Sequence, residues 1–340
     1  MLYVNCDKIM AKKLLVYFLI MLLTAYPASA EEVSLDRWVL NVTLNENGLV
    51  EVIIQVELKN SGTSNLDGFS FVVPVSVTID DNQSTGVTMD DTGGMKFNSP
   101  GVKQQTVSGG TNIIISFEKP IEPGKIWNGR IGYITEKMAI KDNSAYSLTV
   151  PVDAPQAIVS GKNVATSASS DADIRAQVFL PKSYEVTSVQ PEPFRNLFQY
   201  GHMVPTWTPE KLHIGDTIII KTTYSDVLAK IVENDDRIRN LKTSIKEAKD
   251  AGKTVLDAET YFANANDNNN KAFASFGGKD YTGALQYAGL ANDDIVKAEN
   301  SLSGTTPKGT PKATEKSPAF EAYVLGFVFL IAVLMQKKRR

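Results

Sequence analysis

Hydrophobic and polar residues alternate strictly in the first part of the chain, as they do in strands that bury one face. The alternation covers residues 37–44 and resumes over residues 50–58. Between these runs, Asn45-Glu46-Asn47-Gly48 supplies residues that tolerate a positive φ, so we expect an antiparallel hairpin. The apolar positions are Trp38, Leu40, Val42 and Leu44, then Val50, Val52, Ile54, Val56 and Leu58.

Shorter β-like segments follow as far as about residue 225, separated by turn residues and prolines. Residues 80–110 are polar and rich in Gly and Thr, which predicts long loops with one short strand at most. Many short strands without intervening helices favour antiparallel sandwiches. A joint at Pro151–Pro155 predicts two β domains, 31–152 and 153–225, with a single larger sandwich as the alternative. The further strands are expected at 69–79, 113–117, 131–134, 146–150, 174–180, 186–189 and 218–224.

The period changes to seven at about Asp226, which is the spacing of a coiled-coil seam. An Asn-rich and Gly-rich stretch, residues 264–280, separates two such runs and predicts a loop. We therefore expect one α-helical hairpin over residues 226–302. The seam of the first helix is Ile231, Ile238, Ile245 and Gly252 with Leu241, Ala248, Val255 and Phe262, and that of the second is Tyr281, Ala288, Ile295 and Leu302 with Ala284, Ala291 and Ala298.

The N-terminal residues 1–30 have the order of a secretory signal peptide. Lys12 and Lys13 precede the apolar run Leu14–Ala25, and Ala28-Ser29-Ala30 supplies small residues for cleavage. Met1 and Met10 are both possible starts. The only cysteine, Cys6, lies in this segment, so the mature chain is expected to have no disulfide and no thiol nucleophile.

The C-terminal end predicts a stalk and a membrane segment. Residues 303–318 are rich in Thr, Lys and Pro, and the 15 residues before Pro318 would reach about 50 Å if fully extended. Residues 319–340 contain the uncharged apolar run Ala322–Met335 and end in Lys-Lys-Arg-Arg. Basic residues stay on the cytoplasmic side, which places the body of the chain outside the cell.

This tail resembles the PGF-type C-terminal sorting signal of archaeal surface proteins, the substrates of archaeosortases. Pro318 and Phe320 match the tripeptide of that family, and Ala319 stands where the family has glycine. The resemblance covers about the last 24 residues. It implies that an archaeosortase-like enzyme removes the tail and attaches a membrane lipid; an ordinary single-pass anchor is the alternative.

Charge and sequons agree with surface display. Without residues 1–30 and 319–340, 28 basic and 36 acidic residues remain, a net charge of −8, so nucleic acid is an unsuitable partner. Asn41-Val42-Thr43 and Asn82-Gln83-Ser84 are acceptor sequons, which makes Asn41 and Asn82 candidate glycosylation sites.

The sequence contains no recognisable catalytic constellation. His202 and His213 do not form an HExxH motif, no Gly-x-Ser-x-Gly motif is present, and we predict neither catalysis nor a cofactor. The acidic groups are expected to lie in solvated turns or on helix faces, and calcium binding by the loop carboxylates is the alternative. The tryptophans are expected to be core residues, and a carbohydrate-binding platform is the alternative. These groups are Asp80-Asp81-Asn82, Asp90-Asp91, Asp171 with Asp173, Asp235-Asp236 and Asp293-Asp294, and the tryptophans are Trp38, Trp127 and Trp207.

These observations predict a mainly β protein with an α-helical hairpin: two antiparallel β-sandwich domains, then the hairpin, the stalk and a C-terminal transmembrane segment. We expect a membrane-anchored extracellular envelope protein with a noncatalytic structural or adhesive role that contacts other envelope proteins. The alternatives are a ligand-binding or sensing ectodomain and an accessory subunit of a membrane enzyme complex with a ribophorin-like layout. A deep apolar pocket between the β domains would favour ligand binding.

Overall fold

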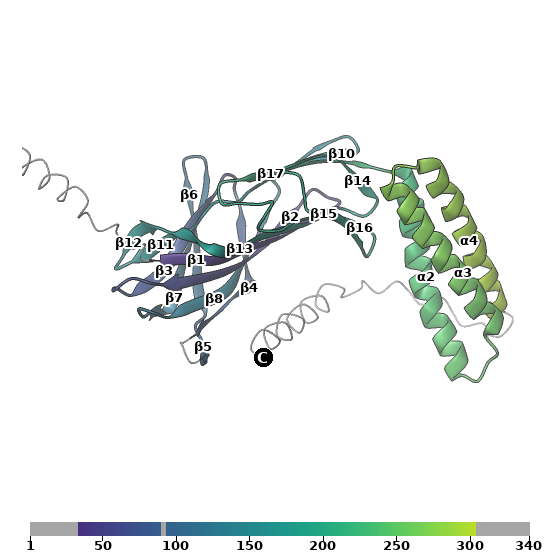
Figure 1. Cartoon of the computed structure of the whole chain (residues 1–340), viewed down its shortest axis with the longest axis horizontal. Coiled ribbons are helices and arrows are strands. Elements are labelled where there is room, and N and C mark those ends of the chain that lie inside the picture. Colours follow the sequence, from purple (N-terminus) through teal and green to yellow (C-terminus); the bar gives the residue numbers. More distant parts are fainter. Residues whose placement is uncertain (1–32, 90–92, 304–340) are drawn as a thin grey trace, which may run out of the picture.

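A computed structural model describes residues 33–89 and 93–303 (Figure 1). Over these residues the chain forms an elongated β body followed by a bundle of helices at one end. The mainly β character and the helical region at the C-terminal side are therefore as the sequence predicts. The predicted signal peptide and C-terminal membrane segment lie outside the described residues, as does the predicted stalk apart from Ser303, which is the last residue of a helix. Within them, no helix is long and apolar enough to cross a membrane.

The largest sheet of the β body has eight strands, and we call it the long sheet. Its strands, in spatial order, are β15 (Arg195–Gln199), β16 (His202–Trp207), β13 (Ser167–Phe179), β1 (Val33–Leu44), β2 (Val50–Asn60), β8 (Ile126–Thr135), β4 (Thr78–Met89) and β5 (Met95–Phe97).

Two smaller sheets complete the β body. The five-stranded sheet consists, in spatial order, of β12 (Lys162–Ala165), β11 (Gln156–Val159), β3 (Leu66–Val73), β7 (Gly110–Ile121) and β6 (Pro100–Val107). The four-stranded sheet consists of β14 (Tyr184–Gln190), β17 (Thr217–Tyr224), β10 (Ala145–Pro151) and β9 (Ala139–Asp142).

The first hairpin confirms the prediction from alternation. β1 and β2 are antiparallel, with Leu44 opposite Val50, and the turn between them contains Gly48 with φ +88°. All nine apolar positions that the alternation singles out are buried, from Trp38 at 2% exposure to Leu58 at 0%. Period-two patterning therefore identifies both the strands and the face that each strand buries.

A parallel pair joins parts of the chain that are far apart in sequence. β1 pairs in parallel with β13, with Trp38 opposite Ile174, while β10 pairs with β17, with Leu148 opposite Ile220. Strands from residues 31–152 and from residues 153–225 therefore share all three sheets, since β11 also pairs with β3 in the five-stranded sheet. The pairing does not stop at the predicted joint, and the long sheet is mixed in place of the purely antiparallel arrangement that the sequence predicts.

All three tryptophans are core residues, as predicted. Trp38, Trp127 and Trp207 are at most 2% exposed. The ring of Trp38 meets that of Phe71 edge to face at 5.5 Å, so the five-stranded sheet packs on the inner face of the long sheet. The indole of Trp127 requires a glycine beside it, because a Cβ on Gly86 would lie 2.5 Å from the ring.

Residues 80–110 differ from the prediction of long loops. They contain most of β4, all of β5 and β6, and the start of β7. The side chains of β5 are all exposed, and most of those of β6 are exposed or half-buried. Neither strand has a buried face, so no period-two apolar pattern marks them, and backbone pairing to β4 and β7 holds them in place.

The helical region has three helices where the sequence predicts a two-helix hairpin. They are α2 (Asp226–Asp250), α3 (Leu256–Gly277) and α4 (Tyr281–Ser303). Gly252, with φ +74°, ends α2, and the amide of Lys253 returns to the carbonyl of Ala248 at 3.0 Å. The heptad pattern runs through this glycine, which concealed the break in the sequence.

The predicted loop at residues 264–280 is mostly the second half of α3. Its asparagines make bonds to other helices: Asn269 Nδ2 donates to the Ile231 carbonyl at 3.2 Å, and Asn268 Nδ2 donates to Asp294 at 3.2 Å. An interhelical partner compensates for the poor helix propensity of asparagine. The inward face of α3 consists of Ala258, Ala265, Asn269, Ala272 and Phe276.

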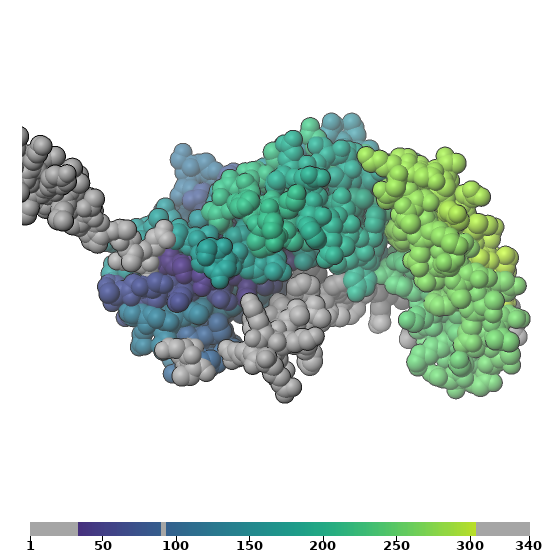
Figure 2. Space-filling model, in the orientation of Figure 1, coloured from purple at the N-terminus to yellow at the C-terminus, as the bar shows by residue number. Residues whose placement is uncertain are grey.

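The bundle packs directly on the end of the β body (Figure 2). A single hydrophobic cluster runs from the sheets into the helices, where it includes Ile231, Ala272 and Phe276. Phe198 of β15 contacts two aromatic rings of α3, Phe273 at 5.0 Å and Phe276 at 6.1 Å between centroids. The helices are thus joined to the sheets by a shared core as well as by the chain.

Candidate functional site

An open groove lies where the first hairpin approaches the bundle, and its volume is about 600 Å³. The β1–β2 turn forms one wall, and residues 181–182 with His202 form the other. The turn is held in shape by its own backbone, since the amide of Gly48 donates to the carbonyl of Asn45 at 2.9 Å. The lining residues are Leu44, Asn45, Glu46, Asn47, Leu49, Glu51, Pro181, Lys182 and His202.

The two walls carry opposite charge. On the turn, Asn45 Nδ2 donates to Glu51 Oε1 at 3.2 Å, which fixes one carboxylate, and Glu46 is exposed. Tyr146 of β10 donates its hydroxyl hydrogen to the Glu46 carbonyl, so the four-stranded sheet also supports this wall. The opposite wall presents Lys182 and the imidazole of His202.

His202 is held in its neutral form. Its Nδ1 lies 2.6 Å from the carbonyl oxygen of Leu180, so the neutral tautomer donates from Nδ1. Burial lowers the pKa of His202, and the nearby Lys182 adds to this, while the Leu180 bond and the Glu46 and Asp236 charges oppose it. The imidazole therefore acts as a structural donor on this wall at neutral pH.

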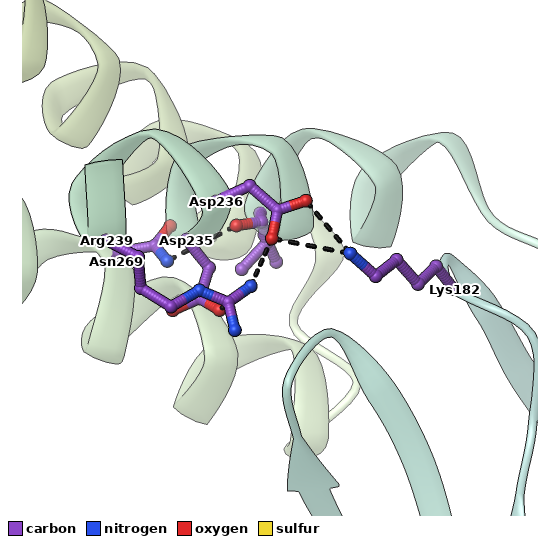
Figure 3. A network of polar contacts seen from close by, with 6 residues as sticks. Lys182, Asp235, Asp236, Arg239 and Asn269 are labelled. Carbon is purple, nitrogen blue, oxygen red and sulfur yellow. Dashed lines mark hydrogen bonds and ion pairs between the residues drawn. The ribbon is translucent and has the colours of Figure 1, made fainter. Parts of the chain in front are cut away.

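A cluster of ion pairs continues from the groove into the bundle (Figure 3). Lys182 reaches from the β body to Asp236 of α2, with Nζ 3.1 Å from Oδ2. Arg239, one helical turn further, pairs with Asp236 and also with Asp235, the latter at 3.2 Å. Burial raises the pKa of Asp235, and the Asp236 charge adds to this while Arg239 opposes it. The cluster links the lysine of the groove to the first helix.

The groove can hold a polar ligand but contains no evident nucleophile and base. The hydrogen bonds of the histidines go to structural partners: His202 to Leu180, and the backbone amide of His213 to Asp216 at 2.7 Å. Over residues 33–89 and 93–303, no three His, Cys, Asp or Glu side chains come close enough to bind a metal ion. The geometry offers hydrogen bonds and opposite charges, which suit recognition.

The acidic residues that the sequence singled out are dispersed. Asp173 forms ion pairs with Arg175 and, at 3.8 Å, with Arg37, on the outer face of the long sheet. The Asp80 carboxylate accepts a hydrogen bond from the backbone amide of Asn82, at 3.1 Å, in an exposed part of β4. Asp90 and Asp91 lie outside the described residues. Charge pairing and local turn geometry account for the described positions.

The two candidate glycosylation sites differ in accessibility. Asn82 is exposed on β4, whereas Asn41 is half-buried in β1, between β2 and β13, with Ile53 and Gln177 opposite it. A glycan on Asn41 would cover the outer face of the long sheet. The sorting residues Pro318, Ala319 and Phe320 lie outside the described residues.

We call the contact between the β body and the helical bundle the junction. Sequence analysis missed the residues that form it. Lys182, Phe198 and Phe273 come from short strands, loops or the predicted loop at 264–280, where no periodic pattern marks them. The groove brings Glu46 close to Lys182 and His202, which are 136 and 156 positions away in the sequence. The ion-pair cluster brings Lys182 to Asp236, 54 positions away. No local signal in the sequence could have located them.

Comparison with known proteins gives no family. No protein-family model matches the sequence, and no curated protein matches it. An M1 zinc metallopeptidase from Deinococcus radiodurans is similar in structure with a TM-score of 0.33 and 10% identity, over 57% of this chain and 42% of that one. The chain thus spans about two fifths of that protein's length.

Two other solved structures have comparable scores. A putative protease from Parabacteroides distasonis ATCC 8503 has a TM-score of 0.35 and 13% identity, over 81% of this chain and 60% of that one. The CBM3a-L domain from scaffoldin cipA of the Clostridium thermocellum cellulosome has a TM-score of 0.29 and 15% identity, over 40% of this chain and 91% of that one. Similarities of this size assign the chain neither a family nor a function.

Proposed function

We propose that the chain is an exported envelope protein with a noncatalytic structural or adhesive role. Its body faces the outside of the cell, and its C-terminal end holds it at the membrane. The proposal takes residues 1–30 as a signal peptide and residues 319–340 as the anchor or sorting segment. In this role the body presents a fixed surface to neighbouring envelope proteins.

The observation that carries the proposal is the continuous core between the β body and the bundle. One hydrophobic cluster includes Trp38 of the long sheet and Phe276 and Ala284 of the bundle. Domains connected by small polar interfaces move relative to each other, whereas a large hydrophobic interface restrains them. A restrained, elongated body suits a spacer or contact surface better than a catalytic pair that opens and closes.

The proposal includes two sandwich-like halves of the β body that share the long sheet. In one half the five-stranded sheet packs on the long sheet through Phe71 and Trp38. In the other half the four-stranded sheet approaches the long sheet, where Tyr146 donates to Glu46 at the end of the first hairpin. The sheets meet around a cavity with room for about one water, 10 Å³, lined in part by Leu40, Phe71 and Pro151.

Sorting of the tail is a separate part of the proposal. An archaeosortase-like enzyme would cut near Pro318 and Phe320 and transfer the protein to a lipid, with Ala319 in the middle of the recognition tripeptide. Glycans at Asn41 and Asn82 would accompany display on the surface.

Intact mass measurement of the membrane-extracted native protein tests this part. Loss of about 20 C-terminal residues with the added mass of a lipid is the expected result, given a hydrophobic segment of the usual length. A retained Arg340 would contradict sorting and leave a single-pass anchor. Deletion of Pro318 to Phe320 is expected to block processing without changing the melting temperature of the body. Protease added to whole cells tests the topology, since a body facing outward is digested.

The open groove between the β1–β2 turn and Lys182 favours ligand binding as a second candidate function. Its acidic wall at Glu46 and Glu51 faces a wall that carries the cation Lys182 and the neutral imidazole of His202, an arrangement that complements a polar ligand with both charges. A thermal-shift screen with sugars, amino acids and short peptides tests it. A ligand that stabilises the native chain but not the Lys182→Met variant would favour this function over a purely structural one.

A further inference from the structure

The outer face of the long sheet ends in a cluster of apolar side chains at the β5 edge. Directly opposed residues of paired strands lie on the same face, and the register places Met89 between Met95 and Ile126, and Val87 beside Phe97. Trp127 points into the core, so its neighbour Ile126 points outward. We name this cluster the apolar corner and define it as Val87, Met89, Met95, Phe97 and Ile126.

The apolar corner is unusually exposed. Phe97 is 82% and Met95 71% exposed, while the other three members are half-buried. Only two other large hydrophobic side chains in the described part of the chain exceed 60% exposure, Ile140 at 70% and Leu256 at 69%. Clustered exposed apolar side chains on a folded surface mark sites of contact with another apolar surface.

The second exposed point, Leu256, lies at the opposite end of the molecule but on the same side. Figure 1 shows β5 at the lower edge of the β body and the connection between α2 and α3, next to Leu256, at the lower end of the bundle. Ile140 differs, because β9 pairs with β10, which Figure 1 places at the upper edge. Three of the four most exposed apolar residues therefore belong to, or lie next to, segments at the lower edge of the molecule in Figure 1.

The last helix also ends on that side of the bundle. α4 begins near β14, where the Tyr281 hydroxyl lies 3.1 Å from Glu185, and ends at Ser303. Near that end, Leu302 packs with Leu241 and Val255, in the part of the bundle away from the β body. Residues 304–340 follow, with the apolar run Ala322–Met335 after the stalk. If that run enters the bilayer, a stalk that is not fully extended brings the membrane close to the side of the apolar corner and Leu256.

We propose that the body lies along the outer surface of the membrane, with Met95 and Phe97 at one end and Leu256 at the other inserted into the lipid headgroup region. This inference rests on the proposed membrane anchor and adds an orientation to it. Aromatic and long apolar side chains partition into that region, and the tail supplies a high local concentration, so each contact needs little affinity of its own.

The charges around the apolar corner indicate apolar insertion as the main interaction. Lys59, opposite Ile126, is an exposed cation beside it, whereas Lys96 lies opposite Thr88 on the other face of the sheet. One exposed lysine contributes only about 1 kcal/mol of attraction to anionic lipid. Binding is therefore expected on phosphatidylcholine vesicles and is expected to change little between 0.1 and 1 M salt, over which the Debye length falls from about 10 to 3 Å.

Site-directed fluorescence in the full-length chain tests the orientation. Because Cys6 is the only cysteine, a Cys6→Ser background allows one environment-sensitive label at a time, through Phe97→Cys, Leu256→Cys or Ile140→Cys. Each protein is reconstituted into phosphatidylcholine vesicles with lipids brominated on the acyl chains. Ile140 is the control, because its exposure of 70% matches that of Leu256 at 69% and is below that of Phe97 at 82%.

Labels at 97 and 256 are expected to be quenched at least about twofold more than the label at 140, since inserted side chains reach about 5–10 Å into the headgroup and acyl boundary. Quenching at 97 no stronger than at 140 overturns the orientation. A blue-shifted label at 97 without quenching by lipid also overturns it, and indicates contact between two copies. Flotation of the Ile140→Cys protein with the vesicles tests the anchor separately, so protein that floats without quenching at 97 refutes the orientation alone.

Discussion

The ring centroid of Phe198 lies 5.0 Å from that of Phe273, and this contact joins a strand of the β body to the second helix of the bundle. The same phenylalanine of β15 also meets Phe276. The junction is thus an aromatic cluster flanked by the ion pairs of Lys182 and Asp236. Which of these two sets of contacts holds the bundle in place can be measured.

Removing an aromatic ring from the junction is expected to destabilise the whole protein. Phe276 is 4% exposed, and Phe276→Ala is expected to lower the free energy of unfolding by about 3–5 kcal/mol, as for other buried aromatic truncations. Chemical denaturation measures the change. Phe194→Ala is the control, because Phe194 is 57% exposed and its truncation should cost less than about 0.5 kcal/mol. Equal effects of the two variants would contradict a shared core.

The ion pair at the junction is expected to contribute little. The side chains of Lys182 and Asp236 are 40% and 43% exposed. A double-mutant cycle with Lys182→Met and Asp236→Asn should give a coupling of about 0.2–1 kcal/mol that declines as salt is raised. A coupling well above this range would mean that charge, more than aromatic packing, positions the bundle.

Two glycines are expected to respond in opposite directions to the same substitution. Gly86→Ala should destabilise by about 1–3 kcal/mol, since its Cβ would lie 2.5 Å from the ring of Trp127. Gly289 is exposed inside α4 with no atom within 4 Å of a Cβ, so Gly289→Ala should stabilise by about 0.5–1 kcal/mol. Thermal melts of the two variants against the parent test both signs.

Stability is expected to depend on pH through His202. Its folded-state pKa is lowered from 6.5, so below about pH 6.5 the unfolded chain binds a proton that the native protein does not. Stability should therefore fall as the pH drops from 6.5 toward the lowered pKa. His202→Gln keeps a donor for Leu180 and should flatten the profile in this window. A profile that keeps its slope in the His202→Gln variant would contradict this assignment.

The sequence predicted the parts of the fold in which one strand or helix face is buried. Alternation located the first hairpin and its buried face, because each inward side chain from Trp38 to Leu58 loses contact with water. The heptads likewise located the inward faces of α2 and α4, from Ile231 to Leu302. In these segments the local pattern and the tertiary environment agree.

Elsewhere, distant contacts override the local pattern. Asn269 would end an isolated helix, but in α3 it donates to the Ile231 carbonyl of another helix. No side chain of β6 is buried, and the strand is held in place by its pairing with β7. The groove at Lys182 and His202 depends on the meeting of three such distant segments. Local propensity does not predict contacts between distant segments, so the candidate site could not be located from the sequence.

The parallel pairing of β1 with β13 has a consequence for biogenesis. Trp38 lies opposite Ile174, so the first strand of the body finds this neighbour only 136 positions later in the chain. Contacts of such long range form slowly and leave strand edges open in the meantime. If export proceeds from the N-terminus, the emerging chain must keep that edge unpaired outside the cell until most of the β region has been translocated. Until then the open edge of β1 is available for pairing with strands of other molecules.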